Sequence, residues 1–563
     1  MATLSNDFVY DDEFQIEANP WIKNLSGVRE AFSTNMWGFM STRSNYYRPM
    51  VHVFYWVIHK AAGLDPWGYH LANILFHSAS SVLVFLISLS LLRARFQEEK
   101  ALSGALIGAG LFIFHPIHAE AVAWASAISE MSFSFFFLLS LYLWMKWRPG
   151  KYLFALGSAL AFFISFLCKE SAVMIPPVLL MYDLLFKRKE NFLSRYFPLM
   201  AAVVFYLFLR VKGLDALLVP VALGKGQVEL SGWGLLINIF PLFAVYLFKL
   251  LLPVKLSVVH LFYVKGLFEP AALVSIPVAL LYGLAVWHAW RTKRQVVLFG
   301  LLFFLFTVLP ALYLKGIAGN TWAERYLYLP SLSFSLIAGY FAVFLLEKRG
   351  RAILALVLPL ALVLAFYAVS TIRRTSVWRD NISLWTDALK KSPDAGIAYV
   401  GLGASFLQAG RLAEAEEHLM RALVYLPEDH QLMNHLGLLY ARKGDLQKSE
   451  GFLKRAIALE PGYAEAHTNL AITYADMGRL AEAVREFEEA GRLLPFFPSA
   501  RFNLGLAYLD AGRPREAAIE LREAVRLDPK DPEFHYNLSI ALRQLGLPGE
   551  AEEETRAAEA LRR

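Results

Sequence analysis

Two patterns of hydrophobic and polar positions divide the chain near residue 370. Up to that point, long apolar runs alternate with short charged loops. Each run approaches the roughly 20 residues that a helix needs to cross a bilayer. The pattern predicts membrane spans at 70–92, 101–116, 128–145, 151–167, 171–186, 195–210, 271–290, 296–314, 327–346 and 352–371. A further apolar segment covers 233–252.

After residue 370, a period of 34 residues governs the chain, and four residue types keep it. The columns are Leu402, Leu436, Leu470, Leu504 and Leu538; Gly410, Gly444, Gly478, Gly512 and Gly546; Pro393, Pro427, Pro461, Pro495 and Pro529; and Ala388, Ala422, Ala456, Ala490 and Ala524. This spacing is typical of tetratricopeptide repeats, whose stacked helix pairs leave a concave surface for a partner. We expect about five repeats, preceded by a partial one at "LWTDALKKSPD".

Composition supports a membrane protein, because 57% of the residues are hydrophobic and only 18% are charged. The net charge of +7 does not imply nucleic acid, since positive loops also orient membrane proteins. Cys168 is the only cysteine, which excludes an internal disulfide. The N-terminus has no pattern of a cleavable signal peptide.

Five positively charged loops fix the expected orientation, because such loops tend to stay in the cytoplasm. They hold Arg93, Arg95 and Lys100; Lys146, Arg148 and Lys151; Lys187, Arg188 and Lys189; Arg291, Lys293 and Arg294; and Lys348, Arg349 and Arg351. All five share one side only if 233–252 does not cross, so we predict an interfacial or re-entrant helix there. The repeats then lie outside, in a periplasm or a lumen.

The predicted organisation has three parts. Residues 1–69 form a first external loop, 70–371 a domain of about ten spans, and 372–563 the repeat domain.

The outward loops carry the candidate functional residues. They are Asp11 and Asp12, Arg48, His115 and His118, Lys169 and Glu170, and Glu324 and Arg325. Ionisable residues at membrane depth are costly and by default mark a functional site. An acidic pair facing several cations suits a reaction on an anionic substrate held at the membrane surface.

Each motif also has a plainer interpretation. Asp11 and Asp12 suit a polar loop or a helix cap equally well. His115 and His118 are only two metal ligands, with a proline between them. Lys169–Glu170 and Glu324–Arg325 are also consistent with simple ion pairs. The convergence of these motifs on one side favours the functional interpretation.

The motifs together resemble one family along nearly the whole chain. They are "FVYDDEFQI", "NPWI", "YYRPM", "GYHLANILFH", "HPIHAEAVAW", "CKESAVMIPPVLLMYDLLF" and "ERYLYLPSL", followed by the repeats. The chain resembles the O-mannosyltransferases with transmembrane helices and tetratricopeptide repeats, and their prokaryotic relatives, in the GT-C superfamily. The resemblance implies an all-α fold, with a polytopic GT-C helix bundle followed by an α-solenoid.

The same resemblance implies an activity and a location. Such enzymes move a mannose-like sugar, with inversion, from a polyprenyl-phosphate donor to an acceptor hydroxyl outside the cytoplasm. The expected acceptor is a protein, modified at Ser or Thr, and the expected location is a bacterial inner membrane. Transfer to a glycan or lipid, and a non-catalytic scaffold whose repeats recruit partners, are the alternatives.

Residue roles follow from the resemblance. Asp11 matches the family's acidic residue and would be the general base, with Asp12 holding the acceptor or tuning its neighbour's charge. Arg48, Lys169 and Arg325 would stabilise the leaving phosphate. His115 and His118 would hydrogen-bond the phosphate or sugar, and Glu170 and Glu324 belong to the same donor site. Some relatives use a divalent cation, so Mg²⁺ or Mn²⁺ at Asp11 and Asp12 stays open.

The chain departs from its relatives at the start, because they carry a transmembrane helix before the acidic loop. Only seven residues precede "FVYDD" here, so we expect a mis-assigned start or a truncated chain.

In the repeats, Asn469, Asn503 and Asn537 recur at the 34-residue step on the predicted concave face. Such a ladder can hydrogen-bond the backbone of an extended acceptor peptide. The alternative, which the pattern supports equally well, is that asparagine recurs in such repeats because it fits their local structure.

Overall fold

The computed structural model describes residues 3–40, 44–148, 150–186, 192–214, 228–229, 232–260, 264–312, 316–317, 322–348 and 353–562. The chain forms two compact units, one made of residues 1–36 and 44–393 and the other of residues 37–43 and 394–563. The predicted all-α fold is confirmed, since the only strands among the described residues are a two-residue antiparallel pair. The cations Lys187, Arg188, Lys189, Arg349 and Arg351 lie outside the described residues.

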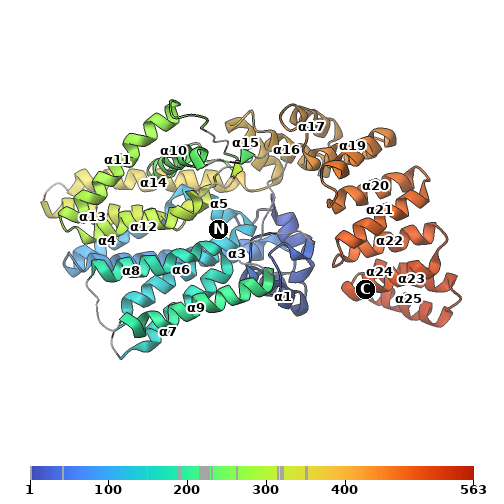
Figure 1. Cartoon of the computed structure of the whole chain (residues 1–563), viewed down its shortest axis with the longest axis horizontal. Helices are drawn as coiled ribbons and strands as arrows, with labels where there is room; N and C mark the ends of the chain where they lie inside the picture. Colours follow the sequence, from blue (N-terminus) through green and yellow to red (C-terminus); the bar gives the residue numbers. More distant parts are fainter. Residues whose placement is uncertain are drawn as a thin grey trace. The chain divides into compact units, whose positions relative to one another are not determined.

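The first unit, here called the membrane unit, contains α1 to α15 (Figure 1). Its α-helices are α1 (Leu25–Ala31), α2 (Pro49–Ala62), α3 (Pro66–Leu92), α4 (Glu98–Phe114), α5 (Ala119–Ala123), α6 (Ile128–Lys146), α7 (Tyr152–Cys168), α8 (Ile175–Leu185), α9 (Phe192–Leu214), α10 (Gly232–Leu251), α11 (Pro270–Arg291), α12 (Gln295–Leu312), α13 (Ser331–Lys348), α14 (Ile353–Val377) and α15 (Asn381–Lys391). Its short turns and strands are η1 (Glu13–Glu17), η2 (Pro20–Ile22), η4 (Pro116–His118), η5 (Ala125–Ala127), η6 (Glu170–Met174), η7 (Glu324–Leu327), β1 (Val228–Glu229) and β2 (Gly316–Ile317).

Seven helices in the described part of the chain are long and apolar enough to cross a membrane. They span Pro66–Leu92, Ala125–Lys146, Arg195–Leu214, Gly232–Leu251, Pro270–Arg291, Gln295–Leu312 and Val357–Val377. An eighth is obtained if α4 and the segment Pro116–Ala123, bent by 46° against each other, form one span. The long helices of the membrane unit run roughly parallel, while α11 crosses them obliquely (Figure 1).

Prolines explain two differences from the predicted spans. The segment 171–186 is a turn over Glu170–Met174 followed by only eleven helical residues, because Pro176 and Pro177 suit only the first turn of a helix. The predicted span 101–116 ends as a regular helix at Phe114, and Pro116 begins the bend. Both breaks bring predicted site residues to helix ends, where their side chains and backbone are free to make specific contacts.

Small and hydroxylated residues allow close packing inside the bundle. The Ser140 hydroxyl on α6 donates to the Ser158 carbonyl on α7, and the Ser158 hydroxyl donates back to the Ser140 carbonyl. A Cβ placed on Gly339 of α13 would lie 2.3 Å from the Gly104 carbonyl of α4. Contacts of these two kinds are how helices associate without a hydrophobic driving force between them.

A second packing device is a buried ion pair, here called the Asp183 cluster, which joins α6, α8 and α9. Arg195, only 1% exposed, donates to Asp183 Oδ1 at 2.7 Å and to the Trp144 carbonyl at 2.8 Å. The Tyr196 hydroxyl and Trp144 Nε1 donate to Asp183 Oδ2, at 2.9 and 3.2 Å. Both carboxylate oxygens are therefore used.

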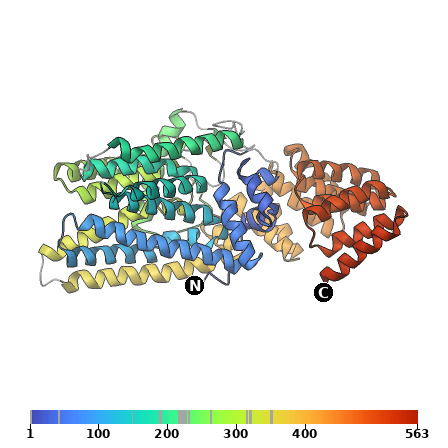
Figure 2. The same cartoon turned by 90° about the horizontal axis from the view of Figure 1, so that it is seen from below.

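The second unit contains five helix pairs with the predicted 34-residue step (Figures 1 and 2). They are α16 (Gly396–Gln408) with α17 (Leu412–Tyr425), α18 (His430–Arg442) with α19 (Leu446–Leu459), α20 (Ala464–Asp476) with α21 (Leu480–Leu493), α22 (Pro498–Asp510) with α23 (Pro514–Leu527), and α24 (Pro532–Gln544) with α25 (Pro548–Arg562).

The turn between the two helices of each pair carries the predicted glycine. The five glycines have φ between 69° and 79°, a left-handed conformation that other residues adopt at a cost. The glycine period in the sequence therefore reports a backbone requirement.

One interaction recurs between the two helices of three successive pairs, where a basic side chain on the first helix contacts a carboxylate 19 residues later. The pairs are His467 with Glu486 at 2.6 Å, Arg501 with Glu520 at 2.9 Å, and His535 with Glu554 at 2.5 Å.

Candidate active site

The two aspartates of the acidic loop lie in different environments. Asp12 is fully buried, and its carboxylate accepts the backbone N–H of Val9 at 3.0 Å and that of Ser126 at 2.7 Å. Burial raises the pKa of Asp12 to about 7, although these hydrogen bonds oppose the shift. Asp12 thus fastens the loop to the segment after α5.

Asp11 is only partly buried and has a different surrounding. Burial raises the pKa of Asp11 to about 6, while the charge of Arg325 and a hydrogen bond with Gln15 lower it. Of the two neighbouring carboxylates, Asp11 is the one that combines access with a nearby cation.

The acidic loop is also held by α15. Tyr10, in the left-handed region at φ 60°, donates its N–H to Asn381 Oδ1 at 2.9 Å. Asn381 Nδ2 donates in turn to Glu13 Oε1 at 3.2 Å, and the Tyr10 ring packs on Trp385 with centroids 5.5 Å apart. The residue preceding Asp11 is therefore fixed in a conformation that non-glycine residues rarely adopt.

Arg325 is oriented by contacts on several sides. It forms an ion pair with Glu120, and its guanidinium lies 4.9 Å from the Trp124 ring centroid and 5.0 Å from that of Tyr326. The second oxygen of Glu120 accepts the Glu324 N–H at 3.0 Å. Buried Glu120 thus fixes both the side chain of Arg325 and the backbone before it.

A cavity of about 700 Å³ lies next to this group. Its charged lining residues are Arg48, Glu130, Lys169, Glu170 and Arg210, and its apolar lining includes Val173, Met174, Leu309, Pro310, Ala311 and Leu329. Three cations against two carboxylates leave the cavity with excess positive charge.

Glu170 organises two of the cations in the cavity. Arg48 Nε donates to Glu170 Oε2 at 2.9 Å, and Arg210 Nη1 lies 3.8 Å from Oε1. Lys169 forms an ion pair with Glu130, and its ammonium lies 4.7 Å from the Tyr326 ring centroid. Tyr326 therefore lines the cavity and also lies near Arg325, and the charges of Arg325 and then Lys169 lower the pKa of its hydroxyl.

Sequence reasoning missed Arg210, Glu130 and Tyr326. Arg210 ends the predicted span 195–210, and Glu130 begins the span near 128. Both are ionisable residues inside apolar segments, a signal that sequence reasoning could have used. Tyr326 directly follows Arg325 in the motif "ERYLYLPSL" and carries no signal of its own.

The two predicted histidines are buried beside the cavity residues but are not among its lining. His115 Nε2 contacts the Leu250 carbonyl at 3.0 Å, and its Nδ1 accepts the Ile117 N–H at 3.2 Å. His118 Nε2 contacts the Ser331 hydroxyl at 2.9 Å. In this arrangement they join η4 to α10 and α13, and their contact with a sugar or phosphate stays a prediction.

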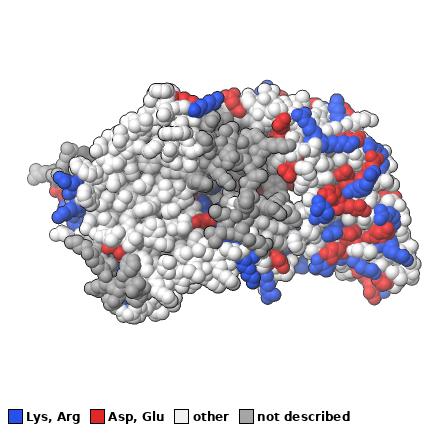
Figure 3. Space-filling view, in the orientation of Figure 1, with Lys and Arg blue, Asp and Glu red and all other residues white. Residues whose placement is uncertain are grey.

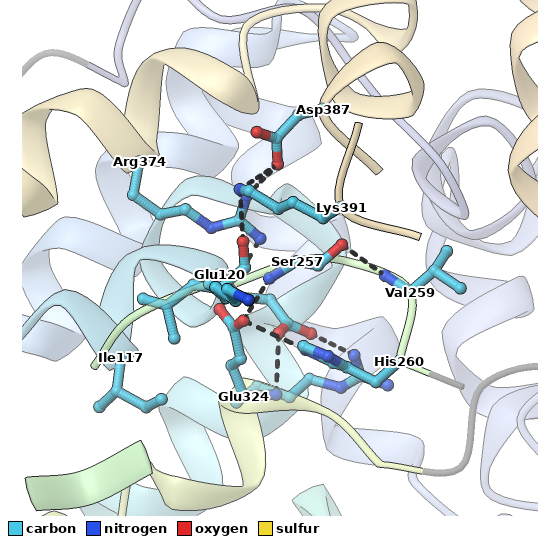
Figure 4. Close-up of polar contacts among 12 residues, drawn as sticks. Ile117, Glu120, Ser257, Val259, His260, Glu324, Arg374, Asp387 and Lys391 are labelled. Carbon is cyan, nitrogen blue, oxygen red and sulfur yellow. Dashed lines mark hydrogen bonds and ion pairs between the residues drawn. The ribbon is translucent and has the colours of Figure 1, made fainter. Parts of the chain in front are cut away.

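Glu324 lies in a buried polar network instead of the cavity (Figure 4). Its Oε1 accepts the Ser257 N–H at 2.5 Å and lies 3.2 Å from His260 Nε2. Arg374, 3.7 Å from Glu324 Oε2, also pairs with Asp387 at 2.9 Å. This network ties η7 to the end of α14 and to α15, a supporting role that the sequence did not reveal.

A divalent cation finds little support in the donor set. Both oxygens of Asp12 already accept backbone N–H groups, which leaves Asp11 as the only open carboxylate of the pair. Among the residues that the structure describes, no three His, Cys, Asp or Glu are arranged to hold a metal ion. A Mg²⁺ or Mn²⁺ ion at Asp11 and Asp12 stays a prediction, and no chemical step is derived through one.

The predicted asparagine ladder makes contacts inside its own unit. Asn469 Nδ2 donates to Asn434 Oδ1 at 2.9 Å, and Asn537 Nδ2 donates to the Glu533 carbonyl at 2.9 Å. Asn503 is partly buried like the other two. Peptide binding by these residues stays a prediction.

Comparisons with known proteins identify both halves of the chain. The tetratricopeptide repeat model matches residues 378–424, 416–464, 468–532 and 502–563. The protein O-mannosyl-transferase F38B6.6 of Caenorhabditis elegans is 28% identical over 443 residues, which cover 77% of this chain and 61% of the relative. The protein O-mannosyl-transferase TMTC2 of Mus musculus is 25% identical over 525 residues, covering 76% of this chain and 61% of that protein.

The chain thus spans about three fifths of the length of these curated relatives. Among solved structures, a chain described as MamA MSR-1 C2 is 28% identical, with a TM-score of 0.27, and covers 30% of this chain and 95% of its own. The resemblance recognised in the sequence motifs is confirmed by the curated relatives. Over about three quarters of its length, this multi-pass membrane protein with tetratricopeptide repeats is a homologue of the proteins named protein O-mannosyl-transferases.

Proposed function

We propose that the protein is an inverting glycosyltransferase that moves a mannose-like sugar from a polyprenyl-phosphate donor to a hydroxyl of a protein acceptor. The observation that carries the proposal is Asp11, a partly buried carboxylate whose pKa is raised to about 6 by burial and lowered by the charge of Arg325, at the same end of the membrane unit as the cationic cavity. The names of the relatives support the same reaction.

In the proposed reaction, the acceptor oxygen bonds to the anomeric carbon as the bond from that carbon to the phosphate oxygen breaks. Asp11 takes the hydroxyl proton, and the electron pair of the broken bond stays on the phosphate. A raised pKa suits a general base, because the carboxylate binds the proton more strongly while still being ionised near neutral pH.

The cavity suits the donor phosphate and the start of its lipid. Arg48 and Arg210 offer guanidinium groups, which bind phosphate oxygens in pairs, and Lys169 adds a point charge. On donor binding, phosphate oxygens would compete with Glu170 for the two arginines. The apolar wall that includes Met174 and Leu329 suits the first units of a polyprenyl chain.

We further propose that the end of the membrane unit carrying Asp11, His115 and Arg325, here called the site end, faces the non-cytoplasmic side. In this topology α10 does not cross. Gly213, near the end of α9, packs against Tyr47, and Leu250, near the end of α10, contacts His115. The strand β1 just before α10 pairs with β2, which follows α12. Contacts at both ends of α10 with site-end segments support an interfacial or re-entrant helix.

The experiment that tests this function measures the transfer of mannose from polyprenyl-phosphate mannose to a Ser/Thr-containing peptide by the purified chain. Asp11→Asn should lower transfer by about 10²- to 10⁴-fold, the usual contribution of a general base. Asp7→Asn removes an exposed carboxylate of the same loop and is the matched control. Full transfer by the Asp11 variant would refute the assignment, and transfer to a lipid or glycan alone would identify a different acceptor.

A further inference from the structure

A second charged cavity lies at the end of the membrane unit opposite to the site end. Its volume is about 310 Å³, and it lies between the loop after α3 and the loop joining α11 to α12. Helix α4 connects the two ends, since it begins at Glu98 near this cavity and ends at Phe114 beside His115. The lining residues used below are Arg95, Lys293, Arg294, Val296, Tyr340 and Phe344.

The cations of this cavity exceed the carboxylates that face them. In the described part of the chain, neither Lys293 nor Arg294 forms an ion pair, although both line the cavity. Arg95 lies 3.8 Å from Glu347, and Lys100 contacts the same carboxylate at 3.2 Å. One carboxylate is thus shared by two cations, and two more cations are left for a ligand.

Two further features favour an anion here. The cavity lies at the N-terminus of α12, where unpaired backbone N–H groups and the helix dipole attract negative charge. Arg294 is partly buried, and its guanidinium lies 5.4 Å from the Phe344 ring centroid, which limits where it can point. Figure 3 shows Lys and Arg side chains gathered at this end of the membrane unit.

We propose that this cavity binds a phosphate group, carried either by an anionic phospholipid headgroup or as free phosphate. Guanidinium and ammonium groups converging from two loops suit phosphate oxygens, and basic pockets between membrane helices bind lipid headgroups in this way. The wall formed by Val296, Tyr340 and Phe344 suits the glycerol and upper acyl region of a lipid. This site is separate from the proposed transfer reaction and does not depend on it.

The test uses the full chain in nanodiscs of phosphatidylcholine, with phosphatidylglycerol added in increasing amounts. Bound lipid is counted by native mass spectrometry after release, and thermal unfolding checks that each variant is folded. The double variant Lys293→Gln/Arg294→Gln should bind phosphatidylglycerol at least about tenfold more weakly than the unchanged chain. Arg291→Gln is the matched control, because Arg291 is the last residue of α11, two residues before Lys293, and lies over the Trp287 ring outside the cavity lining.

A parallel arm adds inorganic phosphate and distinguishes the two sources. If millimolar phosphate displaces phosphatidylglycerol from the unchanged chain but has no effect on the double variant, the cavity is assigned to free phosphate. If the unchanged chain retains phosphatidylglycerol in the presence of phosphate, the cavity is assigned to the lipid. Equal binding of phosphatidylcholine, or an equal loss in Arg291→Gln, would overturn the proposal, because either result would reflect general charge or hydrophobicity.

Discussion

Two buried charged clusters of the membrane unit use the same types of side chain for different purposes. In the Asp183 cluster, Arg195, Tyr196 and Trp144 use both oxygens of Asp183. At the site end, Arg325 is also paired with a buried carboxylate, yet its charge still acts on Asp11 and Tyr326. A saturated group has nothing left for a ligand, so it stabilises the fold. A group with unused charge beside a cavity can bind and react.

The largest effect expected from this comparison is on stability at the Asp183 cluster. Arg195→Ala leaves the carboxylate of Asp183 buried without its cation, which should lower the free energy of unfolding by about 3–5 kcal/mol. Thermal unfolding in detergent measures this loss. Asp11→Asn, at the site end, should unfold within about 0.5 kcal/mol of the unchanged chain, the usual range away from special contacts. A similar loss of unfolding free energy in both variants would contradict the distinction between the Asp183 cluster and the site end.

A second prediction separates the two neighbouring aspartates. Asp12→Ala leaves the N–H groups of Val9 and Ser126 without their acceptor and should lower the free energy of unfolding by about 1–3 kcal/mol. Asp12→Asn keeps one acceptor oxygen and should cost less. Unfolding and peptide transfer are measured together, because we assign Asp12 to holding the acidic loop in place and Asp11 to the general base. A stable Asp12→Ala chain with no transfer would instead give Asp12 a chemical role.

The third prediction is the pH dependence of transfer. Asp11 must be ionised to accept a proton, and burial raises its pKa to about 6. Transfer should therefore rise with pH through about 6, and fall about tenfold for each pH unit below it. Initial rates between pH 4.5 and 8 measure the profile. A rate that stays constant down to pH 4.5 would contradict a base with this pKa.

The smallest effect is expected in the repeats, where the ion pairs lie nearer to solvent. The hydrogen bond to Glu486 raises the pKa of His467 above its usual value, although burial opposes the shift. A raised pKa in the folded state means that this pair stabilises the repeat at pH values below the pKa of unfolded histidine. The contribution is lost as pH rises through the folded pKa.

Hydrogen exchange of residues 464–493 in the full chain measures this loss as lower protection factors above that pH, since a protection factor already corrects for the intrinsic rise of exchange with pH. His467→Gln should remove the pH dependence of the protection factors of this segment while leaving the protection of 532–562 unchanged. An unaltered pH dependence in the variant would exclude this histidine as its source.

Periodic features of the fold were predictable from the sequence, and contacts between distant segments were not. The glycine column predicted the turns because Gly478 and its equivalents satisfy a local backbone requirement. The separation of Asp11 from Asp12 depends on the Ser126 N–H, 114 residues away, which no local pattern reports. Arg210 carried a local signal as a charged residue in an apolar segment, but only folding shows that it lies beside Glu170.

The contacts of α15 with the acidic loop determine where the chain can be shortened. A chain ending after Val377 would lose Asn381 and Trp385, and with them the hydrogen bond and ring contact that hold Tyr10 in its unusual conformation. A chain ending at Pro393 would keep both contacts and still lack all five helix pairs. These two end points differ by 16 residues, yet only the longer chain would report what the repeats themselves contribute.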